Sequence, residues 1–371
     1  MNEGEQFKAV PVPDRVDPVA QLPVHRLDFR FHGQGGEYFR IWIVNLALSI
    51  ITLSIYSAWA KVRMLRYFYG NTELAQSRFD FHGRPTAILI GRLVMLTFVV
   101  AYVSLSKFAP LGALCLMLLL GLVSPWLIWR SMKFRLGNTS YRNIRFGFNG
   151  TLKDAYKYLL LTPLLTIVSL GLAFPFVQQR MARYLINHVR YGDAQLATKV
   201  SVSEFYIVYL AMLGVLMGCG MVFGIVVALG GAAVFASMHG AKLDHAMFPM
   251  LIAAGGFAYL LMLAGYFLVA RVGMTMLQQL IWNKADLTGH RFESRIQVWA
   301  ATKFHLGNIG LLIITLGLAW AWVKVRSARF RLENLSLHAS GGLTGISAVA
   351  VAPGGAVGEE MADMFNFDFA L

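Results

Sequence analysis

A repeated segment limits what this chain can fold into more than any other feature. The apolar stretches around Thr52, Ser169 and Thr315 resemble one another, and two arginines follow each hydroxyl residue at offsets of eleven and fourteen. These arginines are Arg63 and Arg66, Arg180 and Arg183, and Arg326 and Arg329. Matching offsets in three segments predict an internal repeat, in which every copy is one supersecondary unit.

Two further units fit between these copies. Trp126, Arg130 and Lys133 repeat the spacing of the first copy, and a weaker copy around Trp282 lacks the paired basic residues. We therefore expect five repeat units between a polar N-terminal segment and a tail that is first rich in Gly and Ala and then acidic and aromatic. The expected bounds are 1–28 for the polar segment, 29–78, 79–145, 146–200, 201–290 and 291–335 for the units, and 336–371 for the tail.

The units carry long apolar runs. Hydrophobic residues make up 57% of the chain and charged residues only 14%, whereas soluble domains carry about 25% charged residues. A helix that crosses the ~30 Å hydrocarbon core of a bilayer contains about 20 apolar residues. The apolar runs cover 41–58, 86–106, 109–129, 157–177, 205–236, 247–282 and 306–323. They predict an α-helical polytopic membrane protein.

The distribution of basic residues predicts the topology. Basic clusters lie beside every unit's apolar part, whereas the two loops inside the longest apolar stretches carry only Lys107 and Lys242. Cytoplasmic loops are enriched in Lys and Arg, and seven simple spans would place equal clusters on alternating sides. We therefore expect five hairpins that all open on the cytoplasmic face, with the repeat motifs and both termini on that side. The three short hairpins would be re-entrant or would lie where the bilayer is thinned.

A short alternating segment begins several units. The Phe-x-Phe-x-Gly strings at 29–33, 79–83 and 146–150 have the period of two that is typical of β-strands. We expect these strands to pair into a small sheet on the cytoplasmic side. The expected fold class is thus an α-helical polytopic membrane protein of repeated hairpins with short cytoplasmic β-segments.

The tryptophans lie near the ends of the apolar runs, close to basic clusters. Amphipathic indole rings concentrate at membrane–water interfaces, so these residues predict an aromatic belt at one interface. They are Trp42, Trp59, Trp126, Trp129, Trp282, Trp299, Trp320 and Trp322.

Long residue strings also resemble a known family. Tyr38–Trp42, Thr52–Arg63, Arg66–Thr72 and Phe79–Gly83 are similar to the DUF898 family of bacterial membrane proteins, also called YjgN-like. The resemblance covers about residues 27–335, and the missing arginines of the fourth unit depart from it. It implies a multi-pass protein of the inner membrane with the family's fold, and it brings no reaction, substrate or catalytic residue.

No motif of catalysis is visible, so we expect no enzyme, no cofactor and no metal site. The zinc-protease, nucleophile-elbow and phosphate-loop patterns are absent from the sequence. The chain has a net charge of +14, and its basic residues lie at the ends of the apolar runs. This position favours anionic lipids over nucleic acid as partners. The apolar runs contain no Asp or Glu, and this disfavours a cation-coupled transporter.

The basic pairs are the best candidates for a binding site. A spacing of three residues places both side chains on one helical face, where they can bind one lipid phosphate. Ordinary snorkelling of long cations toward the interface is the alternative. The candidates are Arg63, Arg66, Arg130, Lys133, Arg180, Arg183, Arg326 and Arg329.

Two functions stay open at this point. The first is passive transport or channel activity through the repeat-built bundle, and the second is anionic-lipid binding or scaffolding without transport. Small residues at four-residue spacing, such as Gly214 and Gly218, are compatible with helix packing inside the chain or with a homo-oligomer. The acidic-aromatic tail is either an unstructured terminus or a strap on the basic face.

Overall fold

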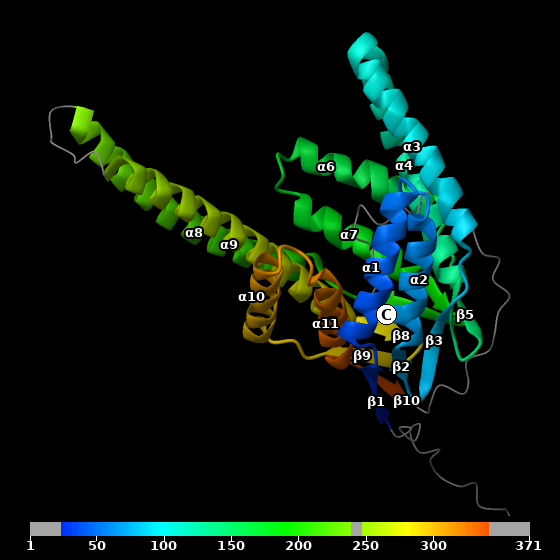
Figure 1. The fold of residues 1–371 in the computed structure, drawn as a ribbon. Helices are drawn as coiled ribbons and strands as arrows, with labels where there is room; N and C mark the ends of the chain where they lie inside the picture. The colour runs from blue at the N-terminus through cyan, green and yellow to red at the C-terminus, as the bar shows by residue number, and fades with distance from the viewer. Residues whose placement is uncertain (1–23, 239–246, 341–371) are drawn as a thin grey trace, which may run out of the picture.

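Ten short strands close into an antiparallel barrel in the computed structural model, which describes residues 24–238 and 247–340 (Figure 1). The order around the barrel is β1–β10–β9–β8–β7–β6–β5–β4–β3–β2. The strands are β1 (Val24–Phe31), β2 (Thr72–Leu74), β3 (Ser77–Phe81), β4 (Thr139–Tyr141), β5 (Ile144–Phe148), β6 (Val189–Tyr191), β7 (Ala194–Thr198), β8 (Ala285–Leu287), β9 (His290–Ser294) and β10 (Leu335–Ser340). The acidic-aromatic tail lies outside the described residues.

The barrel corrects the expected fold class. The prediction of an α-helical polytopic fold with short cytoplasmic β-segments in a small sheet was wrong, because ten strands form one closed antiparallel barrel. The first and last described strands close it, with Val24 opposite Ser340 and Asp28 opposite Ser336. The sequence hides this closure, because β2, β4, β6 and β8 contain only three residues each and show no readable alternation.

Tight turns join the strands at one end of the barrel. Between β2 and β3 the turn residues Ala75 and Gln76 both have positive φ, and so do Arg142 and Asn143 between β4 and β5. Two positive φ angles define the type I′ turn, which Asn-Gly usually signals in a sequence. These turns lack that dipeptide, so the hairpins could not be recognised from their turn residues.

Helices leave the barrel at the opposite rim. Each strand that enters a helical hairpin pairs with the strand that leaves it, as β1 does with β2 and β3 with β4. The helices are α1 (Gly35–Ile51), α2 (Ser57–Gly70), α3 (Pro85–Phe108), α4 (Pro110–Gly137), α5 (Leu152–Tyr156), the π-helical η1 (Lys157–Leu161), α6 (Thr162–Val168), α7 (Phe174–Asn187), α8 (Val202–Met238), α9 (Met247–Asn283), α10 (Val298–Ile314) and α11 (Trp320–Glu333).

The helical hairpins have two sizes. Four helices are long and apolar enough to cross a membrane: Pro85–Phe108, Pro110–Gly137, Val202–Ala232 and Pro249–Asn283. They form the α3–α4 and α8–α9 hairpins, which extend far beyond the others and diverge from each other (Figure 1). The hairpins α1–α2, α5–α7 and α10–α11 are shorter.

Aromatic side chains fill the barrel. Phe79 stacks on Tyr141 with ring centroids 4.6 Å apart, and Phe146 lies 4.9 Å from Tyr191. The glycine of the Phe-x-Phe-x-Gly string lets the second phenylalanine fold over the backbone, since a Cβ at Gly83 would lie 2.4 Å from the Phe81 ring. The strands have three to eight residues, whereas a strand that crosses a membrane needs about 9–11. The strands of the barrel are therefore too short to cross a membrane, and its interior is packed with aromatic rings.

The packed interior predicts a large effect of one truncation. Phe79 is 3% exposed and stacks on three other rings, so Phe79→Ala should lower the free energy of unfolding by about 3–5 kcal/mol. Phe108→Ala is the matched control, because Phe108 lies at the end of a spanning helix and is 88% exposed. Denaturant-dependent unfolding in detergent should separate the two variants, and equal losses would contradict a barrel core.

Candidate functional site

The predicted basic pairs all lie on the second helix of a hairpin, near the barrel rim. Their second members contact the barrel itself in two cases: Arg66 donates from Nε to the Phe81 carbonyl at 3.3 Å, and Arg329 donates to the Gly33 carbonyl at 2.8 Å. In the second hairpin the ammonium of Lys133 lies 3.9 Å from the Trp129 ring centroid. Arg66, Lys133 and Arg329 therefore contact other parts of the chain.

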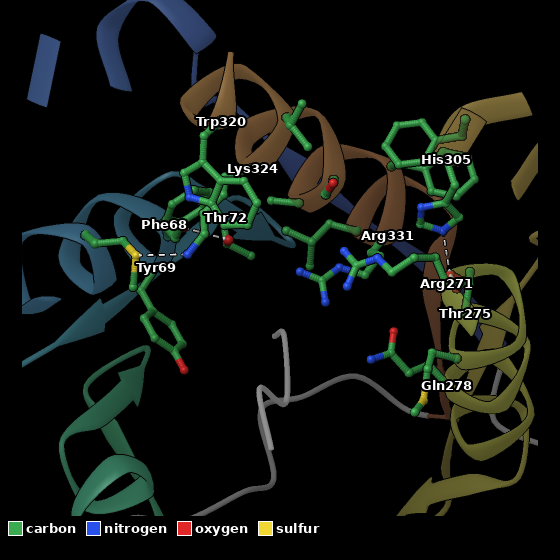
Figure 2. Close-up of a pocket in the computed structure, with 18 of the residues that line it drawn as sticks. Phe68, Tyr69, Thr72, Arg271, Thr275, Gln278, His305, Trp320, Lys324 and Arg331 are labelled. Carbon is green, nitrogen blue, oxygen red and sulfur yellow. Dashed lines mark hydrogen bonds between the residues drawn. The ribbon is translucent and has the colours of Figure 1, made fainter. Parts of the chain in front are cut away.

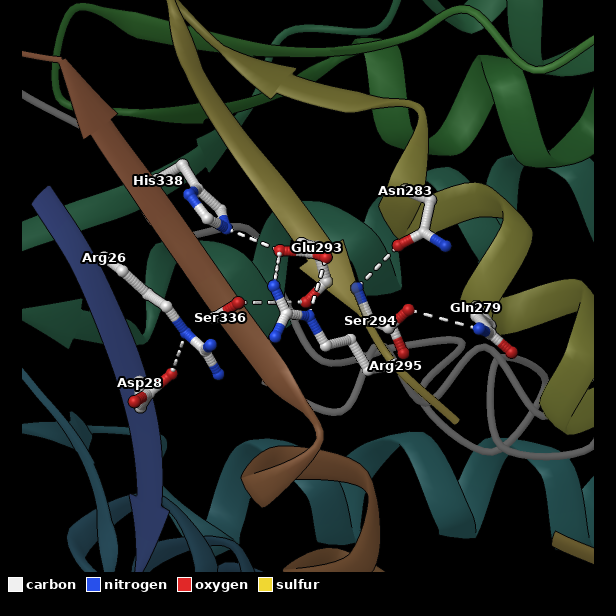
Figure 3. A network of polar contacts seen from close by, with 9 residues as sticks. All are labelled: Arg26, Asp28, Gln279, Asn283, Glu293, Ser294, Arg295, Ser336 and His338. Carbon is white, nitrogen blue, oxygen red and sulfur yellow. Dashed lines mark hydrogen bonds and ion pairs between the residues drawn. The ribbon is translucent and has the colours of Figure 1, made fainter. Parts of the chain in front are cut away.

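The contact to the rim recurs in all five helical hairpins. Trp129 donates from its indole to the Gly150 carbonyl at 2.6 Å, Gln179 to the Val200 carbonyl at 2.7 Å, and Gln279 to the Ser294 carbonyl at 3.1 Å (Figure 3). We call these donors the rim clamps, and they are Arg66, Trp129, Gln179, Gln279 and Arg329. Each clamp joins its hairpin to the end of the strand that enters the next hairpin or to the residues just after that strand, and Arg329 closes the ring onto the first.

The first members of the basic pairs point elsewhere. Arg130 lies over Trp126, Arg180 over Phe176, and Arg326 over Phe304, at 5.1–5.7 Å from the ring centroids. Arg63 is exposed, and Arg183 is half-buried. The eight predicted residues are spread around the rim and do not converge on one site.

The tryptophans divide into two groups. Trp59, Trp299, Trp320 and Trp322 are exposed, which suits an interfacial belt. The other four, Trp42, Trp126, Trp129 and Trp282, are half-buried. Among these, Trp129 is a rim clamp and Trp282 packs on Phe292 of the barrel at 5.0 Å. Contacts with the barrel and its rim therefore account for the position of some tryptophans, in addition to the preference of indole rings for the membrane interface.

A cavity of about 330 Å³ lies between α2, α9, α10 and α11 (Figure 2). Three cationic residues line it: Arg271 from the spanning helix α9, and Lys324 and Arg331 from the short helix α11. The guanidinium groups of Arg271 and Arg331 point into the same space. The cavity thus gathers three cationic side chains from two helices.

Apolar and neutral polar groups complete this cationic pocket. Phe304 stacks on Phe330 at 4.2 Å, and His305 shares a 2.8 Å hydrogen bond with the Thr275 hydroxyl. The lining runs along α11 from Leu332 near the rim to Trp320 at the membrane end of the helix. The pocket therefore offers charge near the barrel and apolar surface toward the bilayer.

Sequence reasoning missed the cationic pocket although one signal pointed to it. Arg271 is a charged residue within the apolar run 247–282, and ionisable residues inside membrane segments usually mark function. Nothing in the sequence indicates that α9 and α11 meet, so Arg331 could not be grouped with Arg271. As for metals, the described ranges hold no cluster of three or more His, Cys, Asp or Glu residues.

An ion cluster on the outer wall of the barrel joins β9 to β10 (Figure 3). Glu293 accepts hydrogen bonds from Arg295 at 2.7 Å and from His338 at 2.7 Å. These bonds lower the pKa of the Glu293 carboxyl to about 2, with the Arg295 bond as the largest cause. The cluster stabilises the pairing of the last two strands.

The lowered pKa predicts a pH dependence. Because the folded pKa lies below the unfolded value of about 4.3, the stabilisation is complete above that value and is lost as the pH falls toward about 2. Glu293→Gln should therefore melt at a lower temperature than the unmodified protein at neutral pH, and the difference should vanish in strong acid. Thermal unfolding of the purified protein across this range tests it, and a pH-independent difference would contradict it.

The rim clamps predict a loss of stability for a buried substitution. Gln179 is 1% exposed and is a clamp, so Gln179→Leu leaves the Val200 carbonyl without its donor and should cost about 1–3 kcal/mol. Gln178→Leu is the matched control, since Gln178 is half-buried on the same helix. Unfolding titrations compare the two, and a greater loss for Gln178→Leu would refute the role of the clamp.

Comparison with known proteins finds relatives by sequence and none by structure. The chain is 31% identical to the inner membrane protein YjgN of Salmonella typhimurium over 205 residues, which are 54% of this chain and 47% of that protein. It is 30% identical to the inner membrane protein YjgN of Escherichia coli K12 over 164 residues, which are 44% and 41% of the two chains. The aligned part thus spans about half the length of these relatives, and no solved structure matches.

The family assignment rests on a longer match. The profile described as "Bacterial protein of unknown function (DUF898)" matches residues 26–364. This range includes all five helical hairpins and the barrel apart from the first two residues of β1. The four membrane-length helices agree with relatives that are named inner membrane proteins. The chain therefore belongs to the DUF898 family of bacterial proteins.

Proposed function

We propose that this protein is an integral inner-membrane protein that binds anionic phospholipid headgroups in the cationic pocket. The observation that carries the proposal is the lining, in which Arg271 from α9 and Lys324 and Arg331 from α11 meet at one cavity together with apolar side chains. Arginine binds phosphate through paired hydrogen bonds, and a pocket between a spanning helix and a short one is open to lipid.

The shape of the pocket favours an amphiphile. Cationic side chains lie along α11 from Arg331 near the rim to Lys324, and Trp320 lies beyond them at the membrane end. A phosphate near the guanidinium groups would direct its acyl chains toward the bilayer. Apolar side chains of the lining, such as Phe304 and Val323, would contact the first part of these chains.

The packed barrel is the reason why we favour lipid binding over passive transport. Passive transport through a repeat-built bundle needs a polar path, and aromatic rings occupy the barrel interior. Transport between the hairpins is the alternative function. The proposal involves no catalytic step, no cofactor and no nucleic acid. It places the barrel and the basic rim in the cytoplasm, where anionic lipid headgroups attract basic residues, and it allows a homo-oligomer.

Native mass spectrometry of the full chain with added phosphatidylglycerol or phosphatidylcholine of equal chain length tests the proposal. We expect preferential retention of phosphatidylglycerol. The double variant Arg271→Gln/Lys324→Gln should lose at least tenfold in affinity, because a hydrogen bond to a charged group contributes about 1.5–3 kcal/mol and about 1.4 kcal/mol corresponds to a factor of ten. Unchanged retention in this variant would refute the site.

The matched control removes two charges outside the pocket. Arg63→Gln/Arg180→Gln changes residues of α2 and α7 that do not line the pocket and should retain the lipid. Loss in the control alone would move binding to the predicted basic pairs. Thermal unfolding provides a second measurement, because a ligand of the folded state raises the melting temperature; phosphatidylglycerol should raise it in the control and not in the pocket variant.

A further inference from the structure

The three short hairpins end in turns with fully exposed apolar side chains. Leu53, Leu170 and Leu316 are 90%, 93% and 92% exposed, and they occupy equivalent positions at positive φ. Their neighbours Ile51, Val168 and Ile314 are also exposed. Exposure of such a surface to water is unfavourable, with a free-energy cost of about 25 cal/mol per Å² of apolar area.

The backbone of these turns is closed by internal hydrogen bonds. In the first turn the amide of Leu53 donates to Ile50 O at 3.1 Å and that of Ser54 donates to Ser49 O at 2.6 Å. The third and fifth units repeat this pattern, with Gly171 donating to Thr166 O at 2.7 Å and Gly317 to Leu312 O at 2.8 Å. The turns thus need no water for these amides.

In each turn one backbone amide has no backbone acceptor, and a side-chain hydroxyl accepts its hydrogen bond. Thr52 accepts from the Tyr56 amide at 2.9 Å, Ser169 from the Ala173 amide at 2.8 Å, and Thr315 from the Ala319 amide at 3.1 Å. All six amides from 52 to 57 therefore have acceptors, and the same holds for 169–174 and 315–320. This explains why a hydroxyl residue stands at the same position of each repeat. Backbone in hydrocarbon must be satisfied internally in this way.

The charges set the depth of the hairpins. The stretch between Arg40 and Lys61 contains 20 residues and no Asp, Glu, Lys or Arg, and the stretch between Lys303 and Lys324 has the same length and property. The third unit has 22 such residues, 158–179. Each stretch is shared by two arms, so one arm has about ten uncharged residues and a reach of about 15 Å. This is half of the ~30 Å hydrocarbon core.

We propose that the three short hairpins are re-entrant elements whose turns lie in acyl chains near the bilayer midplane. They occupy the leaflet nearer the barrel and do not reach the opposite surface. The occupant around the turns is lipid, because these hairpins leave the same barrel rim as the spanning helices α3, α4, α8 and α9. The turn between α3 and α4 differs from the turns of the short hairpins, because Lys107 and Pro110 flank it. In this arrangement it lies at the opposite membrane interface.

Nitroxide labels measure this depth directly. Cysteine is introduced at position 53, 170 or 316 by Leu→Cys substitution in a chain that carries Cys115→Ala and Cys219→Ala, and the labelled protein is reconstituted into bilayers. We expect collision rates with oxygen to be high and those with a water-soluble nickel chelate to be low at all three positions. Lys107→Cys is the control and should show the opposite pattern, with labelling by a membrane-impermeant maleimide from the side away from the barrel.

Two outcomes would overturn the proposal. Labelling of the leucine positions from the same side as Lys107→Cys would show that the short hairpins span the bilayer. High nickel collision rates at these positions would show that the turns lie in water. Three equivalent turns protect the test against a variant that fails to fold, and the measured depth is independent of lipid binding in the cationic pocket, because Leu53, Leu170 and Leu316 do not line it.

The hydroxyl positions give a second measurement. Thr315→Val keeps the size of the side chain but removes the acceptor of the Ala319 amide. In a hydrocarbon environment this amide would have no replacement partner, so the melting temperature should fall in bilayers. Thr302→Val is the matched control, because its hydroxyl donates to the Val298 carbonyl on α10 and accepts no turn amide. Equal melting temperatures for the two variants would contradict burial of the turn in lipid.

Discussion

The structure depends on the pairing of each strand that enters a helical hairpin with the strand that leaves it. This pairing brings both bases of a hairpin to the same rim, so that all five project from one end of the barrel. Aromatic packing inside the barrel and the rim clamps outside it then fix the positions of neighbouring hairpins. The hairpins can differ greatly in length because their bases are held in the same way.

The cationic pocket follows from this difference in length. At the rim the units are equivalent, but α9 extends far beyond α11 and α2. Arg271 on the long helix therefore faces the flank of shorter helices, where Arg331 and Lys324 lie. The site forms where a spanning helix meets helices of two short hairpins. A nearly regular scaffold thus supports one specific site.

The sequence allowed part of this to be predicted, for physical reasons. Charge placement and apolar runs indicated which segments meet the membrane, and the alternating strings at 29–33, 79–83 and 146–150 indicated strands. The three-residue partner strands and the Ala75–Gln76 turn carry too little local signal. Closure through Val24 and Ser340 is a long-range pairing that no local pattern encodes. The cationic pocket stayed hidden because Arg271 and Arg331 come from different units, and its α2 side comes from the first unit, which is distant in sequence.

Barrel closure also has a consequence for synthesis in the cell. The strand β1 is made first, and its partner β10 is made more than 300 residues later. Until then β1 has an open edge, and open strand edges recruit other chains. Insertion of the hairpins tethers each finished unit at the membrane surface during this interval. The bilayer therefore acts as a folding template, which holds the growing sheet in place until its last strand arrives.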